Sequence, residues 1–112
     1  MFASQHRLRG LTVMVDHNHQ QAFGYTADVL SSDAMVDRWR AFGWEVFPAD
    51  GHDEATLARI LRADAGDRPR VIVAETTFGK GVSYMEGEIK WHYLPMSDSE
   101  YELAMTEIEV GG

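Results

Sequence analysis

A cluster of polar side chains follows directly after an apolar run near the start of the sequence. Leu11–Val15 holds five apolar or β-branched residues, and Asp16–Gln21 then reads DHNHQQ. Asn18 offers an amide oxygen, and the backbone carbonyls after it are expected to be free of strand pairing. Hard cations such as Mg²⁺ prefer oxygen ligands of this kind, shared with the oxygens of a bound diphosphate. The residue types therefore make this segment a candidate site for a Mg²⁺–diphosphate group.

Two other interpretations of the same segment stay open from the residues alone. His17 and His19 are one residue apart, so their imidazoles could chelate a transition metal. A His-x-His pair is a short pattern that also occurs on ordinary surfaces. Polar residues after a strand usually form a solvated turn with no ligand at all.

Three apolar runs are predicted to form the strands that position this segment. They are Leu11–Val15, Trp44–Phe47 and Val71–Ala74. None of them alternates between apolar and polar residues, which is typical of strands buried on both faces. Such strands occur in parallel sheets that helices cover on each side.

Three helical patterns follow the runs. Ser32 can cap a helix that begins near Asp33, and Gly43 can end it. A second helix is predicted over Asp53–Ala65, and a third after the capping-box sequence Ser97–Glu100. The apolar stripes of these helices are Met35, Trp39 and Phe42; Leu57, Ile60 and Leu61; and Tyr101, Met105 and Ile108.

The order strand, helix, strand, helix, strand, long loop, helix predicts an α/β fold. Alternation of this kind favours βαβ units with right-handed crossovers around a parallel sheet. We expect residues 1–112 to form one partial domain, a three-layer βαβαβ-α arrangement. Three parallel strands leave two open edges, which such sheets rarely expose. The sheet is therefore expected to be incomplete without a partner chain, unless the sequence is a fragment.

Composition narrows the class of protein. The 112 residues carry a formal net charge of -8, are 45% hydrophobic and include no Cys. The acidic balance argues against binding to nucleic acid or to an anionic membrane, since both need basic patches. No apolar run is long enough to cross a bilayer, and MFASQHRLRG lacks the apolar core of a signal peptide. We expect a soluble, cytoplasmic, globular protein.

Further blocks occur in order after VDHNHQQAFG. They are AFGWEV at 41–46, DGHD at 50–53, TTFGKGVSYME at 76–86 and WH at 91–92. Together they resemble the thiamine-diphosphate-binding domain of transketolases, particularly the split type whose N-terminal domain is a separate subunit. The resemblance runs from Leu11 to the end of the chain and corresponds to the C-terminal half of that domain. Each block is short, but their order and spacing are specific.

The resemblance implies roles for four residues. Asn18 through its side chain and Gln20 through its backbone carbonyl would ligate Mg²⁺, or Ca²⁺ or Mn²⁺ in its place. Lys80, in a Gly-Lys-Gly loop, would lie near the phosphates, and His92 would reach the diphosphate and the sugar and act catalytically. The alternatives are an Asx-turn at Asn18, a loop residue at Gln20, a solvated Lys80, and a half-buried His92 beside Trp91.

Several family features differ or are missing. Phe78 stands where many members have Lys, and Tyr93 replaces the Gly that usually follows the histidine. No Gly-Asp-Gly, whose Asp is the family's main charged Mg²⁺ ligand, occurs anywhere in the chain. The domain that carries the Glu that activates the cofactor's aminopyrimidine ring is also missing. The turn Asp50–Asp53 is expected to be structural, with Gly51 turning the chain and His52 or Asp53 starting a helix.

The function implied is a share in a transketolase-like enzyme that transfers a two-carbon ketol unit from a sugar or keto substrate. Partner subunits would supply the Gly-Asp-Gly half-motif and the pyrimidine-binding domain in a hetero-oligomer. The isolated chain is then expected to be inactive. Two alternatives remain: a binding or scaffold paralogue that has lost catalysis, and a truncated chain.

Overall fold

A parallel three-stranded sheet organises the chain, and the computed structural model describes residues 1–29, 34–64 and 66–111. The strands are β1 (Thr12–His17), β4 (Glu45–Asp50) and β5 (Arg70–Glu75), in the spatial order β1-β5-β4. The remaining elements are α1 (Phe2–Gln5), β2 (Gln20–Gln21), β3 (Gly24–Tyr25), α2 (Thr26–Val29), α3 (Met35–Ala41), α4 (Glu54–Arg62), the 3₁₀ helix η1 (Ile89–His92) and α5 (Asp98–Gly111).

Only the central strand is buried on both faces. Val71, Ile72 and Val73 of β5 are at most 1% exposed. β1 and β4 are the edge strands of the described sheet, and their residues are half-buried or exposed. The prediction that all three strands are buried on both faces is therefore wrong for two of them, because each edge strand has a neighbour on one side only.

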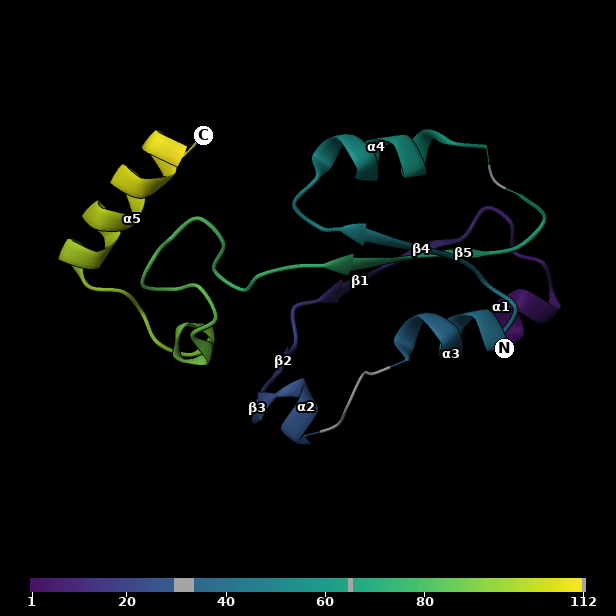
Figure 1. The fold of residues 1–112 in the computed structure, drawn as a ribbon, viewed down its shortest axis with the longest axis horizontal. Helices are drawn as coiled ribbons and strands as arrows, with labels where there is room; N and C mark the ends of the chain where they lie inside the picture. The colour runs from purple at the N-terminus through teal and green to yellow at the C-terminus, as the bar shows by residue number, and fades with distance from the viewer. Residues whose placement is uncertain (30–33, 65, 112) are drawn as a thin grey trace.

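Helices cover both faces of the sheet, which confirms the three-layer α/β prediction. Figure 1 shows α4 on one side of the strands and α1 and α3 on the other. The two clusters of buried residues are Trp44, Val71 and Val73 toward α1 and α3, and Ile60, Ile72 and Ala74 toward α4. Since side chains alternate along a strand, consecutive residues of β5 enter opposite clusters.

The helix predicted from Ser32 to Gly43 is shorter than expected. Ser32 and Asp33 lie outside the described residues, and α3 begins after Ala34, which has a left-handed backbone and makes no capping hydrogen bond through its side chain. The predicted end is confirmed: Gly43 has φ +81° and its N–H donates to the Arg40 carbonyl. Of the predicted stripe, Met35 and Trp39 pack on the core, whereas Phe42 is 49% exposed.

The second helix confirms its predicted start. Asp53 accepts a hydrogen bond from the Thr56 N–H at 3.0 Å and is the N-cap of α4. Leu57 and Ile60 pack against the sheet, but Leu61 is 47% exposed. The apolar stripe of this helix is therefore narrower than predicted.

The third helix begins with the predicted capping box. The Ser97 N–H donates to the Glu100 carboxylate at 2.7 Å, and the Glu100 N–H donates to Ser97 Oγ at 3.4 Å. In α5 the buried residue is Ala104, whereas all three members of the predicted stripe, Tyr101, Met105 and Ile108, are exposed. Figure 1 shows α5 and the segment before it beyond the carboxyl ends of the strands, away from the sheet. Among the described helices, none is both long and apolar enough to cross a membrane.

Candidate functional site

The carboxyl ends of the three strands meet at one edge of the sheet. In the two parallel pairings, Glu75 at the end of β5 is the Cα partner of His17 in β1 and of Asp50 in β4. β1 extends two residues further than predicted, so Asp16 and His17 belong to the strand and not to the turn after it. Open α/β sheets bind ligands at this edge.

The turn after β1 is held by Asn18. Its side-chain oxygen accepts a hydrogen bond from the Gln20 N–H at 3.0 Å, and His19 between them has φ +59°. The Asx-turn considered as an alternative role for Asn18 is therefore present. An amide oxygen has two lone pairs, so this bond leaves one for a further partner.

Gln20 is not the loop residue considered as its alternative, because Gln20–Gln21 form β2, which pairs with β3. The expectation that the carbonyls after Asn18 are free of strand pairing is therefore wrong, and the His19 carbonyl accepts from the Thr26 N–H at 2.8 Å.

Gln20 joins the turn after β1 to the segment before α5. Its side-chain amide donates to the Gly87 carbonyl at 2.7 Å. Its Oε1 is buried and has no hydrogen-bond partner among the described residues. Gln20 lines a cavity of about 100 Å³ together with Gly24, Tyr25, Gly87, Glu88 and Ile89. A buried oxygen without a donor is costly, so a cation or a donor group here would be stabilised.

Glu75 forms a small ionisable cluster with two histidines. His17 Nδ1 lies 2.7 Å from one carboxylate oxygen of Glu75, and His19 Nε2 lies 2.7 Å from the other. Partial burial is the largest single effect and raises the pKa of Glu75, but the hydrogen bonds and the charges of His17 and His19 together lower it more, so the pKa lies below its ordinary value. Glu75 was missed from the sequence because only the strand register places it beside His17.

The turn between β4 and α4 fastens to the end of β5. The Gly51 N–H donates to the Glu75 carbonyl at 2.7 Å, and the Thr77 N–H donates to His52 Nε2 at 2.8 Å. A Cβ at Gly51 would clash with the side chain of Thr76. These contacts give the turn the structural role that its sequence predicted, with Asp53 as the cap, and they add a tether through His52.

Lys80 lies on an exposed loop after β5. Gly79 on one side has φ +70°, and a Cβ there would lie 2.6 Å from the Met85 carbonyl oxygen. On the other side the Gly81 N–H donates to the Glu86 carboxylate at 3.0 Å. In the described part of the chain no hydrogen bond joins the Lys80 side chain to Asn18 or Gln20.

His92 lies at the end of η1 and is exposed, so the half-buried alternative for it is wrong. Its ring packs edge-on against Tyr93, with the centroids 4.8 Å apart. The Tyr93 hydroxyl donates to the Ala22 carbonyl at 3.0 Å, and Trp91 Nε1 donates to the Tyr84 carbonyl at 2.8 Å. Tyr93 thus brings the neighbourhood of His92 to the β2–β3 hairpin that follows Gln20.

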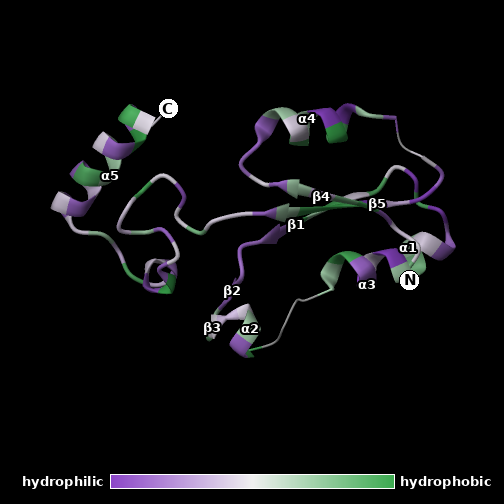
Figure 2. Cartoon of the chain, in the orientation of Figure 1, coloured by the Kyte–Doolittle hydropathy of each residue, from purple (hydrophilic) through white to green (hydrophobic). Residues whose placement is uncertain are grey.

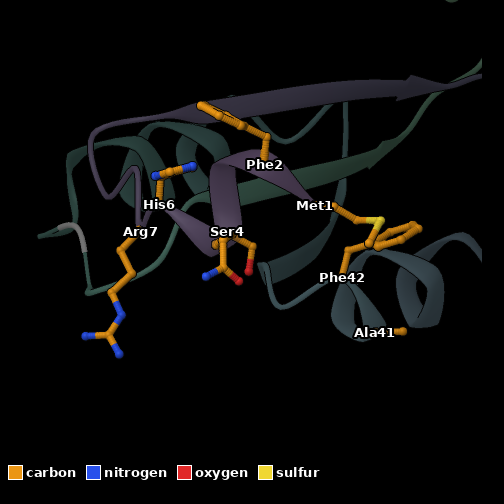
Figure 3. Close-up of a pocket in the computed structure, with 8 residues that line it drawn as sticks. Met1, Phe2, Ser4, His6, Arg7, Ala41 and Phe42 are labelled. Atoms are coloured by element: carbon orange, nitrogen blue, oxygen red, sulfur yellow. The ribbon is translucent and has the colours of Figure 1, made fainter.

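A second hollow lies at the other end of the sheet. It is an open groove of about 660 Å³ between α1 and the end of α3. Figure 3 shows Phe2, His6 and Arg7 on the α1 side and Phe42 on the α3 side. None of the residues predicted for the functional site lines this groove.

Comparison with known proteins decides the family. Residues 1–111 match the family described as transketolase, thiamine diphosphate binding domain. The chain belongs to this family. It is 38% identical over 110 residues to an apulose-4-phosphate transketolase subunit of Phocaeicola vulgatus, covering 96% of this chain and 39% of that protein. It is 36% identical over 114 aligned residues to 6-deoxy-6-sulfo-D-fructose transketolase subunit SqwG of a Clostridium species, covering 100% and 42%.

The fold agrees with that assignment. The crystal structure of transketolase from Campylobacter jejuni superposes with a TM-score of 0.80 at 25% identity, over 95% of this chain and 17% of that one. The resemblance predicted from the motifs is thereby confirmed. The chain spans about two fifths of the length of the two curated subunits that it matches.

Proposed function

We propose that this chain is part of a transketolase-type, thiamine-diphosphate-dependent enzyme that transfers a two-carbon ketol unit. In this proposal Asn18 and Gln20 ligate the Mg²⁺ that holds the cofactor's diphosphate, and Lys80 and His92 face the diphosphate and the substrate. The observation that carries it is the family match over residues 1–111, combined with the Asn18–Gln20 turn at the ligand-binding edge of the sheet.

The donor set fits a magnesium diphosphate. In the proposal Asn18 binds through the remaining lone pair of its amide oxygen and Gln20 through its backbone carbonyl. The buried Gln20 Oε1, which has no hydrogen-bond partner among the described residues, supports the proposal as a further oxygen acceptor of the same turn. Both ligand groups are neutral, so the charge of the Mg²⁺ ion would be balanced by the phosphates of the cofactor and by a carboxylate from another chain. Ca²⁺ or Mn²⁺ could bind to the same oxygens in place of Mg²⁺. When bound, thiamine diphosphate supplies the nucleophile and the electron sink for carbon–carbon bond cleavage.

The other two residues act through charge and protons. The exposed Lys80 ammonium would donate to phosphate oxygens, on a loop whose shape Gly79 makes possible. The exposed His92 imidazole would donate a hydrogen bond to an anionic oxygen, or move a proton near neutral pH, through its ring nitrogens.

The proposal includes partner subunits. The relatives are named as subunits, and the chain has no Gly-Asp-Gly to supply the charged Mg²⁺ ligand. Met14 of the edge strand β1 is 48% exposed and belongs to neither buried cluster. We propose that partner chains cover this strand, complete the sheet, and bring the Gly-Asp-Gly half-motif and the pyrimidine-binding domain. The isolated chain would then be inactive toward sugar or keto substrates.

The test is an affinity purification of the tagged chain from the cells that make it, with mass spectrometry of proteins and of retained thiamine diphosphate. Recovery of a Gly-Asp-Gly protein together with the cofactor is the expected result. Recovery of a protein partner without cofactor would favour the scaffold paralogue instead. Recovery of the chain alone, without cofactor, would overturn the proposal.

A further inference from the structure

Three metal-ligating side chains converge where β1 and β5 end. The register makes His17 and Glu75 Cα partners in neighbouring strands. His17 Nδ1 and His19 Nε2 each lie 2.7 Å from a different oxygen of the Glu75 carboxylate. One ligand atom from each of the three residues can be chosen so that all lie within 4.8 Å of one another.

The backbone determines this arrangement. In an extended strand, residues 17 and 19 would point the same way but stand two residues apart along the strand. Here the left-handed conformation of His19, at φ +59°, and the Asn18 Asx-turn fold the chain back. The two imidazole rings consequently lie side by side, with centroids 4.3 Å apart.

The cluster is anchored on one side and open on the other. The His17 side chain is 14% exposed, whereas those of Glu75 and His19 are 51% and 60% exposed. An ion can therefore enter from solvent, and water can take the remaining coordination position. Open sites of this kind, with three protein ligands and a water, are a common form of zinc coordination.

We propose that His17, His19 and Glu75 form a binding site for a transition-metal dication of the Zn²⁺ type. Two imidazole nitrogens and one carboxylate oxygen are ligands that suit Zn²⁺, Co²⁺ or Ni²⁺, whereas Mg²⁺ prefers oxygen alone. The site is chemically distinct from the neutral oxygens of Asn18 and Gln20. None of its ligands is assigned to the cofactor, so metal binding here is tested without thiamine diphosphate, but the Asn18 turn shapes both sites.

Binding requires a small adjustment and a shift of protons. Zinc at about 2.0–2.2 Å from each ligand holds neighbouring tetrahedral ligand atoms about 3.3 Å apart. The 2.7 Å contact to the Glu75 oxygen that binds would open by roughly 0.6 Å, and ligand atoms as far as 4.8 Å apart would close by up to roughly 1.5 Å through side-chain rotation. A neutral imidazole that donates to Glu75 would move its proton to the other ring nitrogen and offer its lone pair to the metal. An imidazolium would release one proton to solvent.

The test is titration of the full chain, free of thiamine diphosphate, with Zn²⁺ in a calorimeter and with Co²⁺ by visible absorption, in a background of millimolar Mg²⁺. One equivalent of metal is expected to bind, with Co²⁺ giving the absorption of a nitrogen–oxygen site. Even lost outer-sphere partners weaken metal sites by about 10–100-fold, so His19→Asn and Glu75→Gln should weaken binding at least about tenfold.

A matched control separates this site from general histidine binding. His6→Asn makes the same change at an exposed histidine on α1's end and should leave affinity unchanged. Circular dichroism verifies folding, which Glu75→Gln should preserve because it keeps the size of the side chain. Absence of stoichiometric binding to the wild-type chain, equal loss in His6→Asn and His19→Asn, or displacement of the metal by Mg²⁺ would overturn the proposal.

Discussion

A single buried cation ties three elements of the fold together. Arg70, at the start of β5, is 9% exposed. Its Nε donates to Thr12 Oγ1 in β1 at 2.9 Å, and its Nη1 donates to the carbonyls of Ile60 and Ala63 at 2.9 and 3.1 Å. Those carbonyls lie at the C-terminal end of α4, where the helix has unpaired acceptors and a partial negative charge. Arg70 therefore supplies hydrogen-bond donors to two of these carbonyls, and its positive charge balances the partial negative charge of the helix end.

Replacing Arg70 tests this role. Arg70→Met keeps most of the apolar stem but removes three hydrogen bonds and leaves two carbonyls without their donor. We expect the free energy of unfolding in urea to fall by about 1–3 kcal/mol. Arg68→Met is the control, because the Arg68 side chain is 57% exposed and its pair with Asp67 is 3.7 Å long; it should change stability by less than about 0.5 kcal/mol. Equal effects of the two substitutions would contradict the argument.

In the loop between β5 and η1, Gly79 is expected to be harder to replace than Gly81. Gly79 and Gly81 both have positive φ, at +70° and +89°. A Cβ at Gly79 would also lie 2.6 Å from the Met85 carbonyl oxygen, whereas a Cβ at Gly81 would meet nothing within 4 Å. The first position is therefore restricted by both backbone conformation and space, the second by conformation only.

Alanine at each position separates the two effects. Gly81→Ala should cost about 1 kcal/mol of stability through its left-handed backbone. Gly79→Ala should cost at least about 1 kcal/mol more, since the carbonyl of Met85 must move. Urea unfolding gives the stability difference, and hydrogen exchange over residues 79–87 locates it. A larger loss in Gly81→Ala would show that the packing of this loop is different.

The last helix is held to the same segment by a carboxylate. Glu107 accepts hydrogen bonds from the Ser83 N–H and from Ser83 Oγ, both at 2.6 Å. These bonds lower the pKa of Glu107. A carboxyl with a lowered pKa adds stability above its unfolded pKa, and that stability is lost as pH falls through the folded pKa.

The pH dependence of stability should reveal this contact. Glu107→Gln replaces the charged carboxylate by a neutral amide, which has only one oxygen to accept the two hydrogen bonds from Ser83. The variant should therefore melt at a lower temperature than wild type near neutral pH. The gap should begin to narrow near the unfolded pKa of a glutamate, about 4.3, and should close as pH falls further through the lowered pKa of the folded carboxyl. Thermal unfolding across pH measures it, with Glu109→Gln on the same helix as the control. A gap that does not depend on pH would exclude an electrostatic contribution.

The sequence predicted the helices and strands better than it predicted which of them pack or pair together. The alternation of strands and helices and the caps at Asp53 and Ser97 depend on local chemistry, and they are confirmed. The strand order and register depend on crossovers between distant segments, so the burial of β1 and β4 and the position of Glu75 could not be predicted. The place of Asn18 after a strand indicated an oxygen ligand, whereas the role of Gln20 came from the family resemblance alone; the structure places both in one turn.

The whole molecule exposes apolar surface at its edges. Met14 on β1 is 48% exposed, and on α5 Ile108 and Val110 are 53% and 83% exposed. Figure 2 shows hydrophobic residues interspersed with hydrophilic ones along α5. A strand edge without a neighbour is a more specific reason to expect a protein contact than exposed apolar residues alone, and β1 has such an edge in the described sheet.

A charge at the edge strand should separate folding from assembly. Met14→Lys should reduce recovery of the partner chain strongly, because a cation would be buried in the completed sheet. Stability of the isolated chain should change by less than about 0.5 kcal/mol, since the site is exposed there. Leu61→Lys, at 47% exposure on α4, is the matched control and should retain the partner. Equal recovery with both variants would place the interface elsewhere.

The measurement that tests the central claim most directly is the amount of thiamine diphosphate retained by the purified assembly. Wild type should retain cofactor in the presence of Mg²⁺, and Asn18→Ala should lose it while keeping its partner. The control is Gln5→Ala, which removes a side-chain amide from α1, far from the site. This variant should retain both the cofactor and the partner. Full cofactor retention by Asn18→Ala would mean that Asn18 shapes the turn only, and that this chain does not hold the metal through it.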